Sequence, residues 1–367
     1  MQFYQPNRKV SYGLDLSKVF IGQKIISSHN ITVDESVHSV WNGFIPTSSY
    51  TENSKEFAGR LGFHQLYLPY GFMMNLTLSI SVESYTYSGI RHIETRDAVY
   101  ISPAFPGDTF SCTIIITGIS HTPDGQTTIL QAFHQLSNQK GEAVFSLTRV
   151  TAFPRLEPRT TIPPTDLQPT HNHLFKEKIL SRVRGITLYN AIDNYTQGDL
   201  VLHPYVRPIG KSENLFWSTY LKNSHPIHYN YQRYQPGEII VSGGIVEAMV
   251  LGIAGYEFRQ ILLSQIKTAF HTSSVMAEDR IGAFSFVDSV NRVMPGFEEI
   301  TVITYGLKNV DTEQELSESD FPECLFDEAV NNHTQIDAID AIIERYCPVL
   351  AGRVCCRIEW TLLRKNE

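Results

Sequence analysis

Apolar and polar residues alternate along several stretches of the chain, which is the pattern of β-strands with one buried face. The clearest stretches are Thr113–Gly118, Thr127–Leu136, Glu142–Thr151, Thr301–Leu307 and Arg353–Leu363. Two other segments, 71–78 and 243–254, are apolar nearly all round and each begins on a glycine. An α-helix of that composition is buried on most sides. The pattern predicts an α+β protein in which two buried helices are each followed by strands.

The same order of elements occurs twice, which indicates an internal repeat. Gly22 and Trp41 recur at the same spacing as Gly198 and Trp217, and residues 31–35 correspond to residues 207–211 at the start of an amphipathic helical stretch. Further correspondences pair Pro46 with Pro226, Gly71 with Gly243, and Pro106-Gly107 with Pro295-Gly296. The chain therefore reads as two units of similar size.

A proline-rich segment separates the two units. Residues 154–169 contain five prolines, which block both helical and ladder hydrogen bonds. We interpret 1–153 as the N-terminal unit, 154–184 as a linker and 185–367 as the C-terminal unit. The stretch 311–345 is acidic and interrupts the strand pattern of the second unit, so we expect a solvated insertion with a short helix from about Thr334 to Arg345. Such an insertion could cover a binding pocket.

Composition narrows the class of protein. The 367 residues are 42% hydrophobic and 19% charged, as in ordinary globular proteins, and the net charge of -8 argues against nucleic acid as a partner. The N-terminus lacks the apolar run of a signal peptide, and no stretch is long and apolar enough to span a bilayer. The five cysteines lack zinc-ligand spacing. We expect a cytoplasmic protein with free thiols and no membrane partner.

Three short stretches resemble sequence motifs of one known protein family. Residues 104–109 read AFPGDT, residues 223–228 read NSHPIH, and residues 240–244 read IVSGG. In this order, and within the repeat, they resemble the strand-opening turn, the hydratase motif and the glycine start of the central helix in the MaoC-like hydratase/dehydratase family. The likeness is greatest to double-hotdog members such as mesaconyl-CoA hydratase and beta-methylmalyl-CoA dehydratase. It implies a tandem hotdog fold, each unit a long helix wrapped by an antiparallel sheet.

The resemblance implies reversible hydration of an α,β-unsaturated acyl thioester, on a short or branched acyl-CoA. An imidazole can exchange protons near neutral pH, so His228 is the predicted acid/base. Backbone N–H groups at a helix start can bind the developing oxyanion, which gives this role to Gly243, helped by Gly244. His225 and Ser242 are predicted to contact the substrate.

The chain departs from the family pattern at one position. Many members have an aspartate five residues before the histidine, whereas this chain has Asn223, which cannot accept a proton. Glu247 is a lone charge in the apolar helix. If it is buried, its pKa should rise, so that it could replace the missing acid. The alternative is that Glu247 meets a cation in a structural role. In the first unit, Gly43 and Ser48 stand opposite Asn223 and His228, so that unit is predicted to be non-catalytic.

Two other functions fit the same residues. One is dehydration of an acyl group bound to a carrier protein in a biosynthetic pathway. The other is a non-catalytic double hotdog that only binds an acyl thioester, which the loss of the aspartate would favour. For the hydratase we expect no metal and no redox cofactor, and the sequence allows a homodimer without fixing the oligomeric state.

Overall fold

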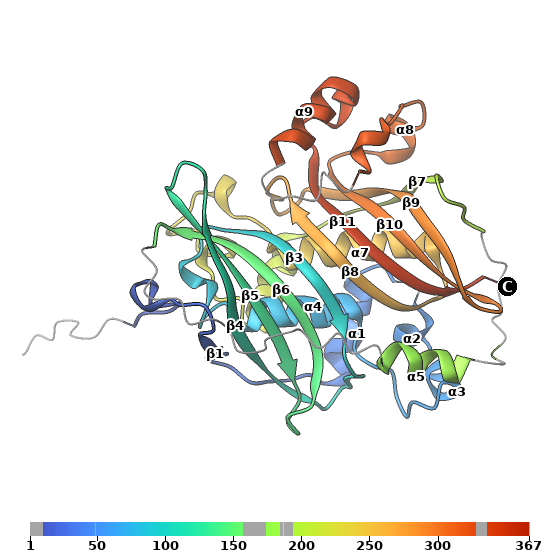
Figure 1. Cartoon of the computed structure of the whole chain (residues 1–367), viewed down its shortest axis with the longest axis horizontal. Coiled ribbons are helices and arrows are strands. Elements are labelled where there is room, and N and C mark those ends of the chain that lie inside the picture. The colour runs from blue at the N-terminus through green and yellow to red at the C-terminus, as the bar shows by residue number, and fades with distance from the viewer. Residues whose placement is uncertain are drawn as a thin grey trace, which may run out of the picture.

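The computed structural model describes residues 10–47, 49–156, 174–183, 186, 194–327 and 336–366. Ser48 and residues 157–173 of the proline-rich segment lie outside the described residues, as does part of the acidic insertion, 328–335. The remaining residues form one large antiparallel sheet with helices packed against it (Figure 1). This is the predicted α+β class.

All strands of the described residues belong to one 11-stranded sheet, in the order β1-β4-β5-β6-β3-β8-β11-β10-β9-β7, with β2 paired to β4. The N-terminal unit contributes β1 (Lys24–Ile26), β2 (Ile31–Thr32), β3 (Arg91–Tyr100), β4 (Thr109–His121), β5 (Thr127–Ser137) and β6 (Ala143–Pro154). The C-terminal unit contributes β7 (Leu200–Pro208), β8 (Ile261–His271), β9 (Arg280–Met294), β10 (Phe297–Lys308) and β11 (Val354–Lys365). The five alternating stretches of the sequence lie in β4, β5, β6, β10 and β11.

The two units join through β3 and β8. These strands pair antiparallel, with Thr95 opposite Ala269 and Ala98 opposite Ile266. Each strand would otherwise be an unpaired edge that could recruit another chain. The units therefore share one continuous sheet, as the equal spacings of the repeat predict.

The two apolar segments form the central helices α4 (Tyr70–Ile80) and α7 (Gly243–Phe258). They lie side by side against the sheet (Figure 1). A Cβ atom on Gly71 would lie 3.2 Å from the Cβ of Ala248, and a Cβ atom on Gly244 would lie 2.5 Å from Oδ1 of Asn75. These two contacts are equivalent between the units, because Asn75 and Ala248 each lie four residues after the glycine of their own helix.

The repeat extends to the shorter elements. Helix α1 (Glu35–Phe44) and helix α6 (Lys211–Tyr220) occupy corresponding places, and their tryptophans meet with ring centroids 4.8 Å apart, Trp41 from the first unit and Trp217 from the second. Gly22 and Gly198 both have positive φ, of 92° and 95°, and each donates its N–H to a strand carbonyl. The remaining helices of the first unit are α2 (Tyr50–Asn53) and α3 (Lys55–Arg60).

One predicted correspondence of the repeat is wrong. Pro106-Gly107 opens β4, whereas Pro295-Gly296 lies in the hairpin between β9 and β10. The counterpart of Gly107 is Glu278, because Gly107 donates to the carbonyl of Val33 at 2.6 Å and Glu278 donates to that of Ile209 at 2.7 Å. Both residues have positive φ, 98° and 78°. Glu278 adopts a backbone conformation that favours glycine, so the residue type gave no sign of the match.

The end of the predicted linker and the acidic insertion are both structured. Helix α5 (Leu174–Val183) buries Phe175, Ile179 and Val183 in the main core. The insertion holds α8 (Thr312–Leu316) and α9 (Ile336–Tyr346), of which α9 is close to the predicted helix. A second apolar cluster joins it to the sheet, with side chains such as Tyr305, Leu316 and Ile343. The insertion is thus partly buried and not merely solvated. None of the described helices is long and apolar enough to cross a membrane.

Candidate active site

A cavity of about 600 Å³ opens where the two units meet. The N-terminal unit lines it with residues of α4, β3 and β6, and the C-terminal unit lines it with the loop before α7, the first turn of α7 and the end of β8. Six of the seven predicted site residues are in its wall: Asn223, His225, His228, Ser242, Gly243 and Gly244. The fold therefore brings together the hydratase-like motif and the glycine start of the helix, which the sequence separates.

His228 lies in a 3-10 turn, Pro226–His228, which ends the short segment after α6. Its Nδ1 lies 2.9 Å from the carbonyl oxygen of Ile240. Because a carbonyl only accepts, Nδ1 holds the proton and Nε2 has a lone pair. Among the described residues Nε2 has no hydrogen-bond partner, and the ring lines the cavity. Burial lowers the pKa of His228 to about 4, against the effect of the Ile240 carbonyl, so the ring is neutral at pH 7.

Asn223 and His225 line the cavity beside His228. The Oδ1 of Asn223 accepts a hydrogen bond from the N–H of His225 at 3.4 Å, which holds the turn. The rings of His225 and His228 lie with centroids 5.9 Å apart. Burial lowers the pKa of His225 as well, so both rings are uncharged near neutral pH.

Ser242 is the N-cap of α7, and Gly243 and Gly244 form its first turn. The first N–H groups of a helix have no partner within the helix, and the helix dipole adds partial positive charge there. No described residue accepts from the Gly243 N–H. A Cβ atom on Gly243 would lie 2.7 Å from Nε2 of His271, so the glycine is needed for close packing of this ring.

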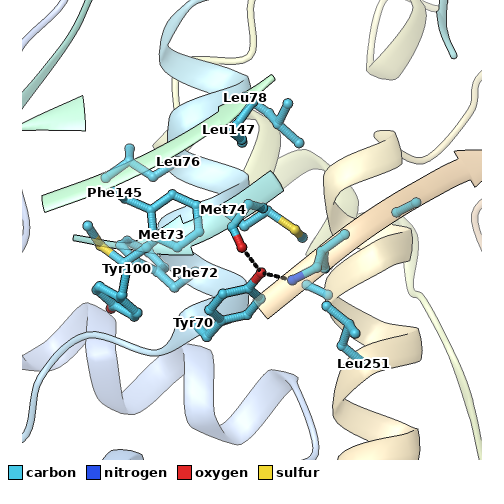
Figure 2. Close-up of a cluster of buried hydrophobic side chains, with 14 of the residues drawn as sticks. Tyr70, Phe72, Met73, Met74, Leu76, Leu78, Tyr100, Phe145, Leu147 and Leu251 are labelled. Carbon is cyan, nitrogen blue, oxygen red and sulfur yellow. Dashed lines mark hydrogen bonds between the residues drawn. The ribbon is translucent and has the colours of Figure 1, made fainter. Parts of the chain in front are cut away.

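In the N-terminal unit, a tyrosine side chain occupies the space that is open at Gly243. The first residue of α4 is Tyr70, so the counterpart of Gly243 is Tyr70, and the predicted match of Gly71 with Gly243 is off by one residue. The Tyr70 N–H donates to the carboxyl group of Glu52 at 2.9 Å. The Tyr70 hydroxyl donates to the Ala98 carbonyl and accepts from the Ile266 N–H (Figure 2). The N–H at the first residue of the central helix thus binds a carboxyl oxygen of the protein itself in the N-terminal unit.

The space around Tyr70 is small. The corresponding pocket of the first unit measures about 50 Å³. Figure 2 shows the Tyr70 ring packed at the start of α4, close to Phe72 and Tyr100 in a cluster of apolar side chains. An acyl group has no room there, which supports the prediction that this unit is non-catalytic.

Glu247, which was predicted to bind substrate and to replace the missing acid, is not one of the described residues that line the cavity. It is fully buried, and its Oε1 lies 3.1 Å from Nε2 of His271 and 3.5 Å from Nε2 of His92. Burial raises the pKa of Glu247, but the hydrogen bonds from the two histidines outweigh it and lower the pKa to about 2. The expected rise of its pKa is therefore wrong: Glu247 is an anion and not a proton carrier.

Three cavity residues were missed by sequence reasoning: His92, Arg149 and His271. Arg149 lies on β6, donates from Nε to Nδ1 of His92 at 3.2 Å and from Nη1 to the carbonyl of Leu78 at 3.0 Å. His92 and His271 lie at the ends of β3 and β8, and Arg149 lies in the middle of the buried run of β6, where a charged residue is a signal that exists in the sequence. Only the pairing of β3 with β8 brings them to one place.

The two histidines and Glu247 have the residue types of a metal site, and one ligand atom of each lies within 4.8 Å of the others. The hydrogen bonds argue against this use. Arg149 can only donate, so Nδ1 of His92 must accept and its proton lies on Nε2, the atom that faces Glu247. A metal would need the lone pair of that Nε2 atom. The arrangement is a hydrogen-bonded cluster around a carboxylate.

Comparisons with known proteins agree with this geometry. No protein-family model matches the chain. Beta-methylmalyl-CoA dehydratase of Chloroflexus aurantiacus is 20% identical over 296 residues, which are 76% of this chain and 83% of that protein. A solved structure of a putative MaoC domain protein dehydratase from Chloroflexus aurantiacus has a TM-score of 0.74 at 20% identity, covering 98% of this chain and all (100%) of the other.

A protein from Mycobacterium tuberculosis with a double hotdog fold has a TM-score of 0.68 at 13% identity, covering 96% of this chain and 98% of the other. At such identities structural likeness establishes the fold. The chain has the double hotdog fold, and its predicted resemblance to the MaoC-like dehydratases is confirmed.

Proposed function

From the double hotdog fold that this chain shares with MaoC-like dehydratases, we propose that it is a hydro-lyase acting on α,β-unsaturated acyl thioesters. The substrate is a short or branched acyl-CoA. The observation on which this rests is the meeting, in one cavity, of a neutral imidazole and a helix-start N–H, where neither Nε2 nor the N–H has a hydrogen-bond partner in the described part of the chain.

The chemistry follows from these two groups. In hydration, Nε2 of His228 takes a proton from water as the water oxygen bonds to the β-carbon. Negative charge moves onto the thioester oxygen, and the Gly243 N–H donates to it, with Gly244 beside it. Glu52 supports this role, because in the first unit its carboxyl oxygen accepts from the equivalent N–H of Tyr70 at 2.9 Å. The position is built to hold a negatively polarised oxygen.

The other predicted residues have supporting roles in this proposal. His225 and Ser242 contact the substrate from the cavity wall. Asn223 holds the His225 N–H and presents its amide to the cavity. No metal and no redox cofactor is needed for the addition of water, and we propose that the enzyme uses neither.

The proposal is tested by following the absorbance of crotonyl-CoA and mesaconyl-CoA with the purified protein. We expect hydration of at least one of them, and a loss of at least about a hundredfold in kcat/KM for His228→Gln, the usual scale for a general acid/base. Ser48→Ala, at the position opposite His228 in the repeat, should change the rate little. Both variants must melt near the wild-type temperature for the comparison to count.

The outcome distinguishes the alternatives. A wild-type protein that is inactive on both thioesters but active on a crotonyl group carried by an acyl carrier protein would be a carrier-protein dehydratase. Binding of the thioesters without turnover would show a non-catalytic acyl-binding protein, and the hydro-lyase proposal would then be wrong.

A further inference from the structure

The cluster of His92, His271 and Glu247 contains two histidines on one carboxylate, and they differ in whether Nδ1 has a hydrogen-bond partner. His92 and His271 both direct Nε2 at Oε1 of Glu247, at 3.5 Å and 3.1 Å. Glu247 is ionised, so both Nε2 atoms hold protons and both Nδ1 atoms have lone pairs. Nδ1 of His92 accepts from Arg149 at 3.2 Å, whereas Nδ1 of His271 has no hydrogen-bond partner among the described residues.

The His271 ring lies against the proposed oxyanion donor. The position of a Cβ atom on Gly243 is 2.7 Å from its Nε2 and 3.1 Å from its Cε1. The ring lines the cavity, with its side chain 11% exposed. In a thioester the α-carbon is bonded directly to the carbonyl carbon. A group that exchanges a proton with the α-carbon must therefore lie beside the residue that binds the carbonyl oxygen, and His271 does.

Resting on the proposed function, we propose that His271 is a second catalytic residue, which transfers the proton at the α-carbon, and that Glu247 is its positioning residue. In hydration, water loses a proton to Nε2 of His228 and its oxygen bonds to the β-carbon. The electron pair of the double bond takes the proton from Nδ1 of a His271 imidazolium. The proton on His228 leaves to solvent, and His271 regains one from solvent, so that the addition consumes one water. Dehydration reverses each transfer.

This assignment explains how the site works without the aspartate of related sequences. Asn223 can accept a hydrogen bond but not a proton. Glu247 cannot replace it directly, because its carboxylate is fully buried behind two imidazoles. It can act through His271, because a carboxylate that accepts from one ring nitrogen stabilises the imidazolium and fixes the ring. Three further contacts hold the pair in place: the Thr95 hydroxyl donates to Glu247 at 3.1 Å, His92 lies on the other side of the carboxylate, and Arg91 donates to the His271 carbonyl at 2.6 Å.

The test separates α-proton transfer from addition of water. Butyryl-CoA is incubated with the full-length protein in D₂O, and deuterium at the α-carbon is measured by mass spectrometry, while hydration of crotonyl-CoA is measured in parallel. We expect His271→Gln to lose at least about a hundredfold in both reactions. His228→Gln should lose hydration but keep α-exchange. His203→Gln is the matched control, because it removes the imidazole of another histidine–glutamate pair, 3.0 Å from Glu257 and outside the cavity wall, and it should stay within about tenfold in both.

Glu247 needs a readout that a merely structural residue would not change. Glu247→Gln should lower kcat of the exchange by at least about tenfold with little change in KM, because the His271 ring loses the carboxylate that orients it, and Glu247→Asp should restore part of the rate. Melting temperatures near that of the wild type show that the variants fold.

Each result has a meaning. If the wild type hydrates crotonyl-CoA and His271→Gln does so at a similar rate, the assignment of His271 is wrong and the proposed function stands. If the wild type exchanges the α-proton in a His271-dependent way but hydrates neither thioester, the assignment stands and the proposed function is wrong. Absence of both reactions in the wild type overturns both. A stoichiometric metal in the purified protein would overturn the assignment too, because it would occupy the ring nitrogens that Glu247 now holds.

Discussion

At the scale of single residues, the environment of a side chain decides its role more than its type does. Glu247 and Glu52 are both buried glutamates at the central helices, and their pKa values move in opposite directions. Burial raises the pKa of Glu52, and its hydrogen bonds from Tyr70 and Thr47 do not offset this. Burial also acts on Glu247, but two histidines outweigh it, so that its pKa falls to about 2. A lone glutamate in an apolar segment of the sequence therefore does not show whether its pKa will rise or fall.

The residue that replaces the family's aspartate can be tested directly. Asn223→Asp keeps the oxygen that accepts from the His225 N–H at 3.4 Å, so the turn should survive. We expect kcat/KM for crotonyl-CoA to stay the same or rise, because the aspartate adds an acid beside His228. A folded but inactive Asn223→Asp variant would mean that the amide N–H₂ donates to the thioester. In that case Asn223 is a specificity residue.

At the scale of the elements, the crossing of α4 and α7 positions the site. The helices approach closely at Gly71 and Gly244, and the glycine at the start of α7 leaves the cavity open beside it. Both helices are apolar nearly all round because the sheet covers them on one side and each covers the other. The crossing thus depends on small residues at two equivalent points.

Substitution of the two glycines should have unequal effects. Gly244→Ala places a Cβ atom 2.5 Å from Oδ1 of Asn75, an overlap that requires a shift, whereas Gly71→Ala places one 3.2 Å from the Ala248 Cβ. We expect Gly244→Ala to lower the free energy of unfolding by about 1–3 kcal/mol, as overpacking does. Gly71→Ala should be close to neutral, because the gain in helix propensity offsets the tighter contact.

A double-mutant cycle with urea unfolding shows whether the contact is the cause. In an Asn75→Ala background, Gly244→Ala should cost less by at least about 0.5 kcal/mol. Equal costs in both backgrounds would show that the strain arises elsewhere in the helix.

At the scale of the whole molecule, the fold buries several histidines away from water. Burial holds the pKa of His92 and His228 at about 4 and that of His134 at about 3, below the ordinary 6.5. The unfolded chain therefore binds more protons than the folded one below pH 6.5. The stabilising contribution of these neutral rings is complete above about pH 6.5 and is lost as the pH falls toward about 4.

We expect the free energy of unfolding to fall by up to about 1.4 kcal/mol per pH unit for each such histidine in this window. Urea unfolding at several pH values between 7.5 and 4.5 measures the slope. His134 lies outside the cavity wall, and His134→Phe keeps a ring beside Tyr85 while it removes one titrating group. The variant should reduce the slope by up to about 1.4 kcal/mol per pH unit. An unchanged slope would show that other groups cause the acid sensitivity.

The sequence by itself determined the repeated order of elements and the two central helices, and its resemblance to the MaoC-like family implied the tandem hotdog architecture and most of the candidate site. These features are local: alternation gives strands, an all-apolar segment gives a buried helix, and Asn223 to Gly244 lie close along the chain. The same local reasoning placed Ser242, Gly243 and Gly244 in the cavity wall.

Only the tertiary structure decided what lies across the junction of the units. His92 comes from β3, Arg149 from β6 and His271 from β8. Pairing of β3 with β8 sets the two histidines around one carboxylate, and Arg149 donates to His92. It also decided the charge of Glu247, since a pKa depends on partners that are distant in sequence and near in space. The counterpart of Gly107 was hidden for a related reason, because backbone conformation at Glu278 is fixed by hydrogen bonds across the fold and not by its own residue type.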